Sequence, residues 1–204
     1  MFEGLKNFLR KRKIRKYESP VKTSFLPIDR ISVVNAVIDV QETGFDQLKE
    51  SMIAWGRKKG IKVTVYFFDF RKLKKGEQLL TGIDKTFLRK ELSWIGTPSM
   101  EKSAPILQEE CDLFISMIDN GDFPIHFLST GAKAKFKIGR YTYDGDPFDM
   151  VFHGGAREEL RGDVCRIFEG LTEFLEKIKV RFDNEWYLCY HCFHKSCDED
   201  TRPR

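Results

Sequence analysis

Two nearly continuous apolar runs, separated by one amphipathic stretch, constrain the fold of this chain more than any other feature. Residues 31–40 and 62–70 are rich in β-branched and aromatic residues, which is typical of strands covered on both faces. Between them, large apolar residues recur at helical spacing and a glycine follows as a stop: Phe45, Leu48, Met52, Trp55 and Gly60. A strand, a helix and a strand in this order predict a βαβ unit with parallel strands and a right-handed crossover.

The rest of the chain continues this alternation. Short apolar segments predict further strands at residues 86–88, 112–118, 136–138 and 148–152. Helical patterns predict helices at residues 103–110, 123–134 and 157–182, and the last of these carries an unbroken apolar stripe that indicates core packing. About six strands alternating with about four helices predict an α/β fold, a doubly wound, mostly parallel Rossmann-like sheet with a long C-terminal helix. The order of the strands stays open.

The excess positive charge of the chain lies entirely near its N-terminus. The net charge is +4 at pH 7, and the first nineteen residues hold seven Lys or Arg against two acids. Residues 20–204 are therefore near neutral, with 28 basic and 29 acidic side chains. This distribution argues against a nucleic-acid-binding surface spread over the fold, so we expect no DNA partner.

The basic segment 1–19 has two interpretations. Its longest apolar run is two residues, too short for a signal peptide. Its pattern is that of a helix with several apolar residues on one face, namely Phe2, Leu5, Phe8 and Leu9. Such a helix either docks on its own domain or frays, or it makes a weak contact with an anionic membrane or another polyanion. Under the second interpretation, Lys6, Arg10 and Lys13 make that contact.

The remaining chain divides into a domain and a tail. Residues 20–182 hold every predicted strand and the predicted helices of the sheet, so we expect one Rossmann-like domain there. Residues 183–204 form a Cys/His-containing tail in which Cys189 and Cys192 have the spacing of a zinc-ligand pair, and His194 or Cys197 would join them. No distant second pair completes a four-ligand site, so an ordinary or disordered tail is the main interpretation. Zinc is the alternative and the one cofactor that the sequence offers, and a CxxC redox pair is a third interpretation.

Polar residues that follow the predicted strands are the candidates for ligand binding. In doubly wound sheets, ligands bind outside the carboxyl ends of the strands, near the point where the strand order reverses. This rule selects Asp39 and Glu42 after the first strand, and Asp119 and Asp122 after the strand at residues 112–118. Turn and cap chemistry is the alternative explanation for the second pair. His153, Gly154 and Gly155, which open the last predicted helix, either bind an anion through free backbone N–H groups or form a flexible turn.

The middle of the chain resembles a known family of enzymes. The strand at residues 112–118, the helix from Phe123 and the segment from Ala132 to Gly139 are similar to the N-terminal, acceptor-side half of heptosyltransferase-like glycosyltransferases. The resemblance covers roughly residues 30–152. The chain also resembles a family of uncharacterised small α/β proteins from Bacteroidota-type bacteria, which share the turn around Trp94, Gly96 and Pro98.

The chain departs from those transferases in two respects. The family carries a Gly-Asp pair after its first strand, whose acid serves as base towards the acceptor sugar. That pair is missing here, and Asp46 is a candidate for its displaced counterpart. The transferases also need a second Rossmann lobe for the nucleotide sugar, and the roughly fifty residues after the last predicted strand do not accommodate one.

We therefore expect a non-enzymatic Rossmann-like module that binds an unknown small molecule or protein. The alternatives are a small enzyme or enzyme subunit acting on a sugar or nucleotide, and a peripheral membrane protein held by its basic N-terminal helix. Five cysteines without a secretion signal indicate a reducing compartment, so we expect a cytoplasmic protein, peripheral to the inner face of the membrane under the third alternative.

Overall fold

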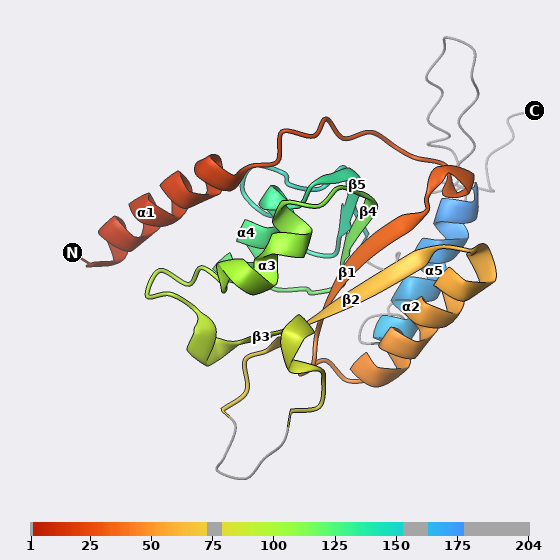
Figure 1. The fold of residues 1–204 in the computed structure, drawn as a ribbon, viewed down its shortest axis with the longest axis horizontal. Coiled ribbons are helices and arrows are strands. Elements are labelled where there is room, and N and C mark those ends of the chain that lie inside the picture. Colours follow the sequence, from red (N-terminus) through yellow and green to blue (C-terminus); the bar gives the residue numbers. More distant parts are fainter. Residues whose placement is uncertain (1, 73–78, 153–162, 178–204) are drawn as a thin grey trace, which may run out of the picture.

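The fold is a six-stranded parallel sheet with helices on both faces (Figure 1), which confirms the predicted α/β, Rossmann-like class. The structure is a computed structural model, and it describes residues 2–72, 79–152 and 163–177. The strand order is β3-β2-β1-β4-β5-β6, so the order reverses between β1 and β4. The strands are β1 (Val33–Asp39), β2 (Lys62–Asp69), β3 (Thr86–Leu88), β4 (Cys111–Ser116), β5 (Ala134–Gly139) and β6 (Met150–Val151).

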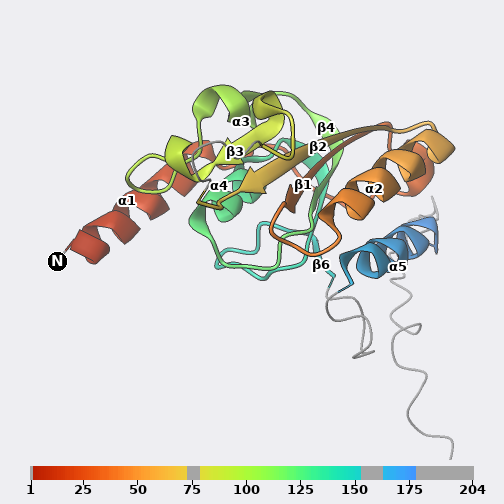
Figure 2. The same ribbon diagram turned by 90° about the horizontal axis from the view of Figure 1, so that it is seen from below.

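The helices form two layers that bury opposite faces of the sheet (Figure 2). One layer contains α2 (Phe45–Lys59) and α5 (Val164–Lys177), and the other contains α1 (Phe2–Tyr17), α3 (Met100–Leu107) and α4 (Phe123–Gly131). Strand side chains alternate between the two resulting cores because successive residues of a strand point to opposite faces. In β1, Val34, Ala36 and Ile38 pack towards α2 and α5, whereas Val37 packs towards α3 and α4.

The element boundaries differ from the predicted ones at three helices. Helix α4 ends at Gly131 rather than at residue 134, because Ala134 begins β5. Helix α3 begins at Met100 rather than at residue 103, because Ser103 lies inside the helix and its hydroxyl donates to the Ser99 carbonyl at 2.7 Å. Helix α5 begins at Val164, directly after the non-helical Asp163, and residues 157–162 and 178–182 of the predicted helix lie outside the described residues. The Asp163 carboxylate accepts the backbone N–H groups of Cys165 and Arg166 there, which is the usual chemistry of a helix start.

The N-terminal helix α1 docks on the rest of the protein through α4. Its C-terminal end is held by the Tyr17 ring, edge-on to Phe127 with centroids 5.5 Å apart, and by the Ser19 amide, which donates to the Thr130 carbonyl. The apolar face predicted for α1 is not the face that docks on the protein. Ile14 and Tyr17 pack against the core, whereas Leu5 and Phe8 are exposed.

Candidate functional site

The carboxyl ends of the strands meet at one edge of the sheet, and the candidate site lies there. The loops that follow β1, β2, β3 and β4 bring residues from distant parts of the chain to this edge. Helix α1 completes it from the side of α4, which follows β4.

A cavity of about 420 Å³ opens at this edge. Helix α1 contributes Lys6 and Arg10, the segment after β3 contributes Arg89 and Trp94, and the start of α4 contributes Asp122. Phe70 and Phe123 add aromatic surface. The cavity thus combines cations, rings and one carboxylate in a position where doubly wound proteins bind small ligands.

The cations that line this cavity form no ion pairs with the described part of the chain. Within the described residues, none of Lys6, Arg10 and Arg89 has a carboxylate oxygen within 4.0 Å. Three cations and one carboxylate line the cavity, so its lining carries an excess of positive charge, which attracts anions.

Arg10 is held in place by uncharged contacts. Its Nε donates to the Ile95 carbonyl at 2.7 Å, and its guanidinium carbon lies 4.8 Å from the centre of the Phe123 ring. Gly96 permits this close approach, since a Cβ there would lie 3.3 Å from an Arg10 terminal nitrogen, and its φ of +91° disfavours other residues. These contacts fix the guanidinium at the cavity without neutralising its charge.

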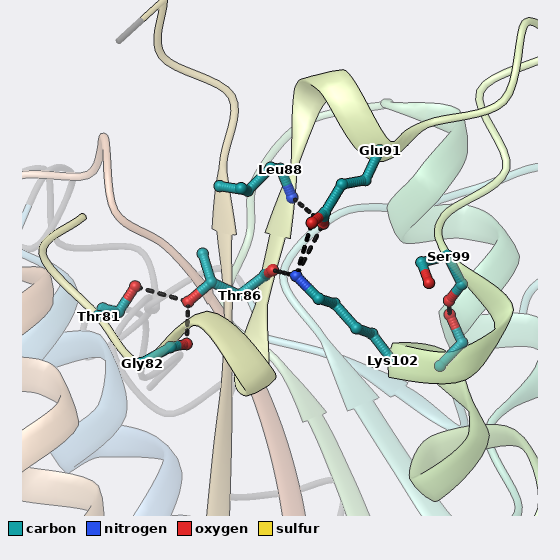
Figure 3. A network of polar contacts seen from close by, with 8 residues as sticks. Thr81, Gly82, Thr86, Leu88, Glu91, Ser99 and Lys102 are labelled. Carbon is teal, nitrogen blue, oxygen red and sulfur yellow. Dashed lines mark hydrogen bonds and ion pairs between the residues drawn. The ribbon is translucent and has the colours of Figure 1, made fainter. Parts of the chain in front are cut away.

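A polar network fixes the segment that carries Arg89 and Trp94 (Figure 3). Lys102 of α3 donates to the Thr86 carbonyl at 2.9 Å and to both oxygens of Glu91 at 2.8 and 2.9 Å. Glu91 also accepts the Leu88 amide, at 3.2 Å. Lys102 therefore ties the edge strand β3 and the residues that follow it to α3.

Carboxylates crowd the same edge next to the cavity. Burial raises the pKa of Asp39 above its usual range, although the Gln41 amide donates to its Oδ1 at 2.8 Å. The nearby charges of Glu42, Asp122 and Asp69 raise this pKa further. Asp122 belongs both to this cluster and to the cavity lining, so the two regions are continuous.

Asp69 differs from Asp39 because its carboxylate forms an ion pair with Arg71. Its buried carboxylate accepts Arg71 Nε at 2.8 Å and a terminal nitrogen at 2.7 Å. These hydrogen bonds lower the pKa of Asp69.

Arg140 occupies the point where the strand order reverses. Its side chain is buried, and its Nη1 donates to Glu42 Oε1 at 2.7 Å and to the Met117 carbonyl at 2.8 Å. Its Nη2 lies 3.6 Å from Asp119 Oδ2. Arg140 thus links the loops after β1, β4 and β5.

The structure brings together most of the site residues that the sequence selected within its described part. Asp39, Glu42, Asp119 and Asp122 all lie at the carboxyl edge. Asp46 is exposed in the first turn of α2, outside the cavity lining. Several other candidates lie outside the described residues: His153, Gly154, Gly155, Cys189, Cys192, His194 and Cys197. In the described part of the chain, no three metal-binding side chains are close enough together to hold an ion.

Sequence reasoning missed three residues that dominate the charge and surface of the site. Arg89 and Arg140 directly follow β3 and β5, so applying the carboxyl-end rule to every strand would have found them. The sequence indicated Trp94 only as part of a turn, yet its side chain lines the cavity and is 64% exposed.

The comparisons place the chain in a family without assigning it an activity. The chain belongs to a family of unknown function (DUF6913), which matches residues 5–159. This range includes every residue that lines the cavity. Neither the curated proteins nor the solved structures contain a match. Among the described helices, none combines the length and the apolar character needed to cross a membrane.

Proposed function

We propose that this protein is a binding module that holds a small anionic metabolite in the cavity at the carboxyl edge of its sheet. The observation that carries the proposal is the convergence of Lys6, Arg10 and Arg89 without carboxylate partners in the described chain. Cations in such a position bind phosphate or carboxylate groups through charge-assisted hydrogen bonds.

The other lining residues specify the rest of the ligand. Trp94 and Phe70 present rings on which an apolar or planar part of a ligand can pack. Asp122 is exposed, and its carboxylate is suited to accept hydrogen bonds from hydroxyl groups. A sugar phosphate or a nucleotide has these three features in one molecule.

Calorimetry and thermal unfolding with a matched panel test this proposal. The panel contains inorganic phosphate, sugar phosphates, nucleoside phosphates and nucleotide sugars, each beside its unphosphorylated parent. We expect binding only to anionic members. Arg89→Gln should weaken it roughly 10- to 100-fold, since a charge-assisted hydrogen bond contributes about 1.5–3 kcal/mol.

Lys90→Gln is the control, because Lys90 is the exposed neighbour of Arg89 and does not line the cavity. Equal affinity for a phosphorylated compound and its parent, or equal losses in both variants, would refute the proposal.

The raised pKa of Asp39 favours a second candidate function, a small enzyme or enzyme subunit that acts on a sugar or nucleotide. A carboxylate with a raised pKa at the reversal point of the sheet is suited to general-base chemistry. Turnover of a nucleotide sugar that is lost in Asp39→Asn, with binding retained, would establish this function. If the unaltered protein binds a nucleotide sugar without turning it over, the protein is a binding module and not an enzyme.

The wider setting of the protein forms part of the proposal. The resemblance to the acceptor-side half of heptosyltransferase-like transferases supports a sugar- or nucleotide-related ligand. We also propose a cytoplasmic protein of Bacteroidota-type bacteria, with one domain over residues 20–182 and a tail over residues 183–204. These statements rest on sequence pattern.

A further inference from the structure

The exposed face of α1 combines cations with large apolar side chains. Its side towards the protein contains Lys6, Arg10, Lys13, Ile14 and Tyr17, all half-buried. The opposite side presents four exposed cations and two large apolar side chains: Lys11, Arg12, Arg15, Lys16, Leu5 and Phe8. At 3.6 residues per turn, these six residues share one half of the helix surface.

This outer face contains charge of one sign. Glu3 lies on the other half of the helix, by the same 3.6-residue periodicity. None of the four cations forms an ion pair with a carboxylate of the described chain. Helix α1 also extends away from the sheet towards its N-terminal end (Figure 1).

The apolar residues indicate what kind of anionic surface fits this face. Leu5 is 51% exposed and Phe8 is 63% exposed, one turn apart. Phosphates and solvated acidic side chains offer nothing to bury two such side chains, whereas an anionic bilayer has acyl chains directly beneath its charged headgroups.

We propose that the outer face of α1 binds an anionic membrane surface. Lys11, Arg12, Arg15 and Lys16 contact acidic headgroups, and Leu5 and Phe8 insert at the boundary between headgroups and acyl chains. Docking of α1 on α4 then holds the cavity next to the bilayer, because Lys6 and Arg10 line that cavity from the other side of the same helix. The binding is reversible, since two apolar side chains and four cations are far from the anchoring strength of a spanning helix.

Vesicle co-sedimentation of the full chain tests this proposal. The unaltered protein should sediment with phosphatidylcholine vesicles that contain roughly one-third phosphatidylglycerol and remain in solution with pure phosphatidylcholine. Binding should weaken at high salt. The double variant Arg12→Glu, Arg15→Glu should lower the partition coefficient by at least ~25-fold, because each cation near an anionic surface contributes roughly fivefold. Leu5→Ser, Phe8→Ser should weaken binding to the same vesicles while the salt dependence remains.

The matched control is Lys62→Glu, Lys177→Glu, which changes the net charge equally at exposed positions in β2 and α5. This control should sediment like the unaltered protein. Circular dichroism and thermal unfolding confirm that each variant is folded. The proposal is overturned if the unaltered protein does not bind anionic vesicles at low salt, if Lys62→Glu, Lys177→Glu loses as much binding as Arg12→Glu, Arg15→Glu, or if RNA or an acidic protein binds this face while vesicles do not. Ligand binding in the cavity is scored separately through Arg89→Gln, so either proposal can fail alone.

Discussion

Lys137 provides the sharpest test of the structure, because it is a buried lysine that forms no ion pair with any described residue. Its side chain is 4% exposed in β5, and its Nζ donates to the Ser129 and Thr130 carbonyls, both at 3.1 Å. These carbonyls belong to the last turn of α4, so Lys137 joins the helix end to the sheet. Burial lowers the pKa of Lys137 from 10.5 to about 8.

This lowered pKa sets the sign and size of a pH effect. Between about pH 8 and pH 10.5 the unfolded chain keeps the lysine proton and the folded protein releases it, so the free energy of unfolding rises with pH. The contribution is complete above pH 10.5 and is lost as the pH falls through about 8. Its full size is about 3 kcal/mol, and about 2 kcal/mol of it develops between about pH 7 and about pH 9.5.

Urea unfolding of the unaltered protein and of Lys137→Met across this range measures the effect. Burial also raises the pKa of Cys111 to about 11 and that of Tyr143, which makes stability fall at high pH in both proteins. These contributions cancel when the free energy of unfolding of Lys137→Met is subtracted from that of the unaltered protein. We expect this difference to grow by about 2 kcal/mol, in favour of the unaltered protein, between about pH 7 and about pH 9.5.

Lys135→Met is the control on the same strand. Lys135 is exposed, and its hydrogen bond and ion pair with Asp112 raise its pKa. The difference in the free energy of unfolding between the unaltered protein and Lys135→Met should therefore stay constant over the same pH range. A constant difference for Lys137→Met as well would show that Lys137 keeps an ordinary pKa and would refute the reasoning.

Three further outcomes follow from individual contacts. Gly139→Ala should destabilise the protein by about 1–3 kcal/mol in urea unfolding, because a Cβ there would lie 2.2 Å from a Phe148 ring carbon. Lys102→Met should lower the free energy of unfolding by about 1–3 kcal/mol, because it removes the half-buried ion pair with Glu91. Proteolysis after β3 should also become faster, and an unchanged cleavage rate would contradict this prediction. In a carbon-detected NMR titration, the Asp39 carboxyl should titrate above the usual aspartate range, and a midpoint at or below that range would rule out its burial at the site.

Local pattern predicted the elements that depend on which side chains are buried. The βαβ unit of β1, α2 and β2 was predicted closely, because apolar periodicity reports burial directly. The start of α5 was not, since the cap formed by Asp163 depends on a single side-chain contact that leaves no periodic signal. The carboxyl-end rule selected Asp39 and Asp122 from their positions after strands.

The amino-acid sequence by itself determined the α/β class, the parallel strands and the edge at which a ligand site should lie. Only the tertiary structure decided the composition of that site. Arg140 meets Glu42 across 98 positions of sequence, and Arg10 meets Ile95 across 85. Such contacts depend on the strand order and on the side of the sheet where α1 docks. Neither is encoded in the spacing of neighbouring residues, because periodicity records that a side chain is buried and not which distant residue covers it.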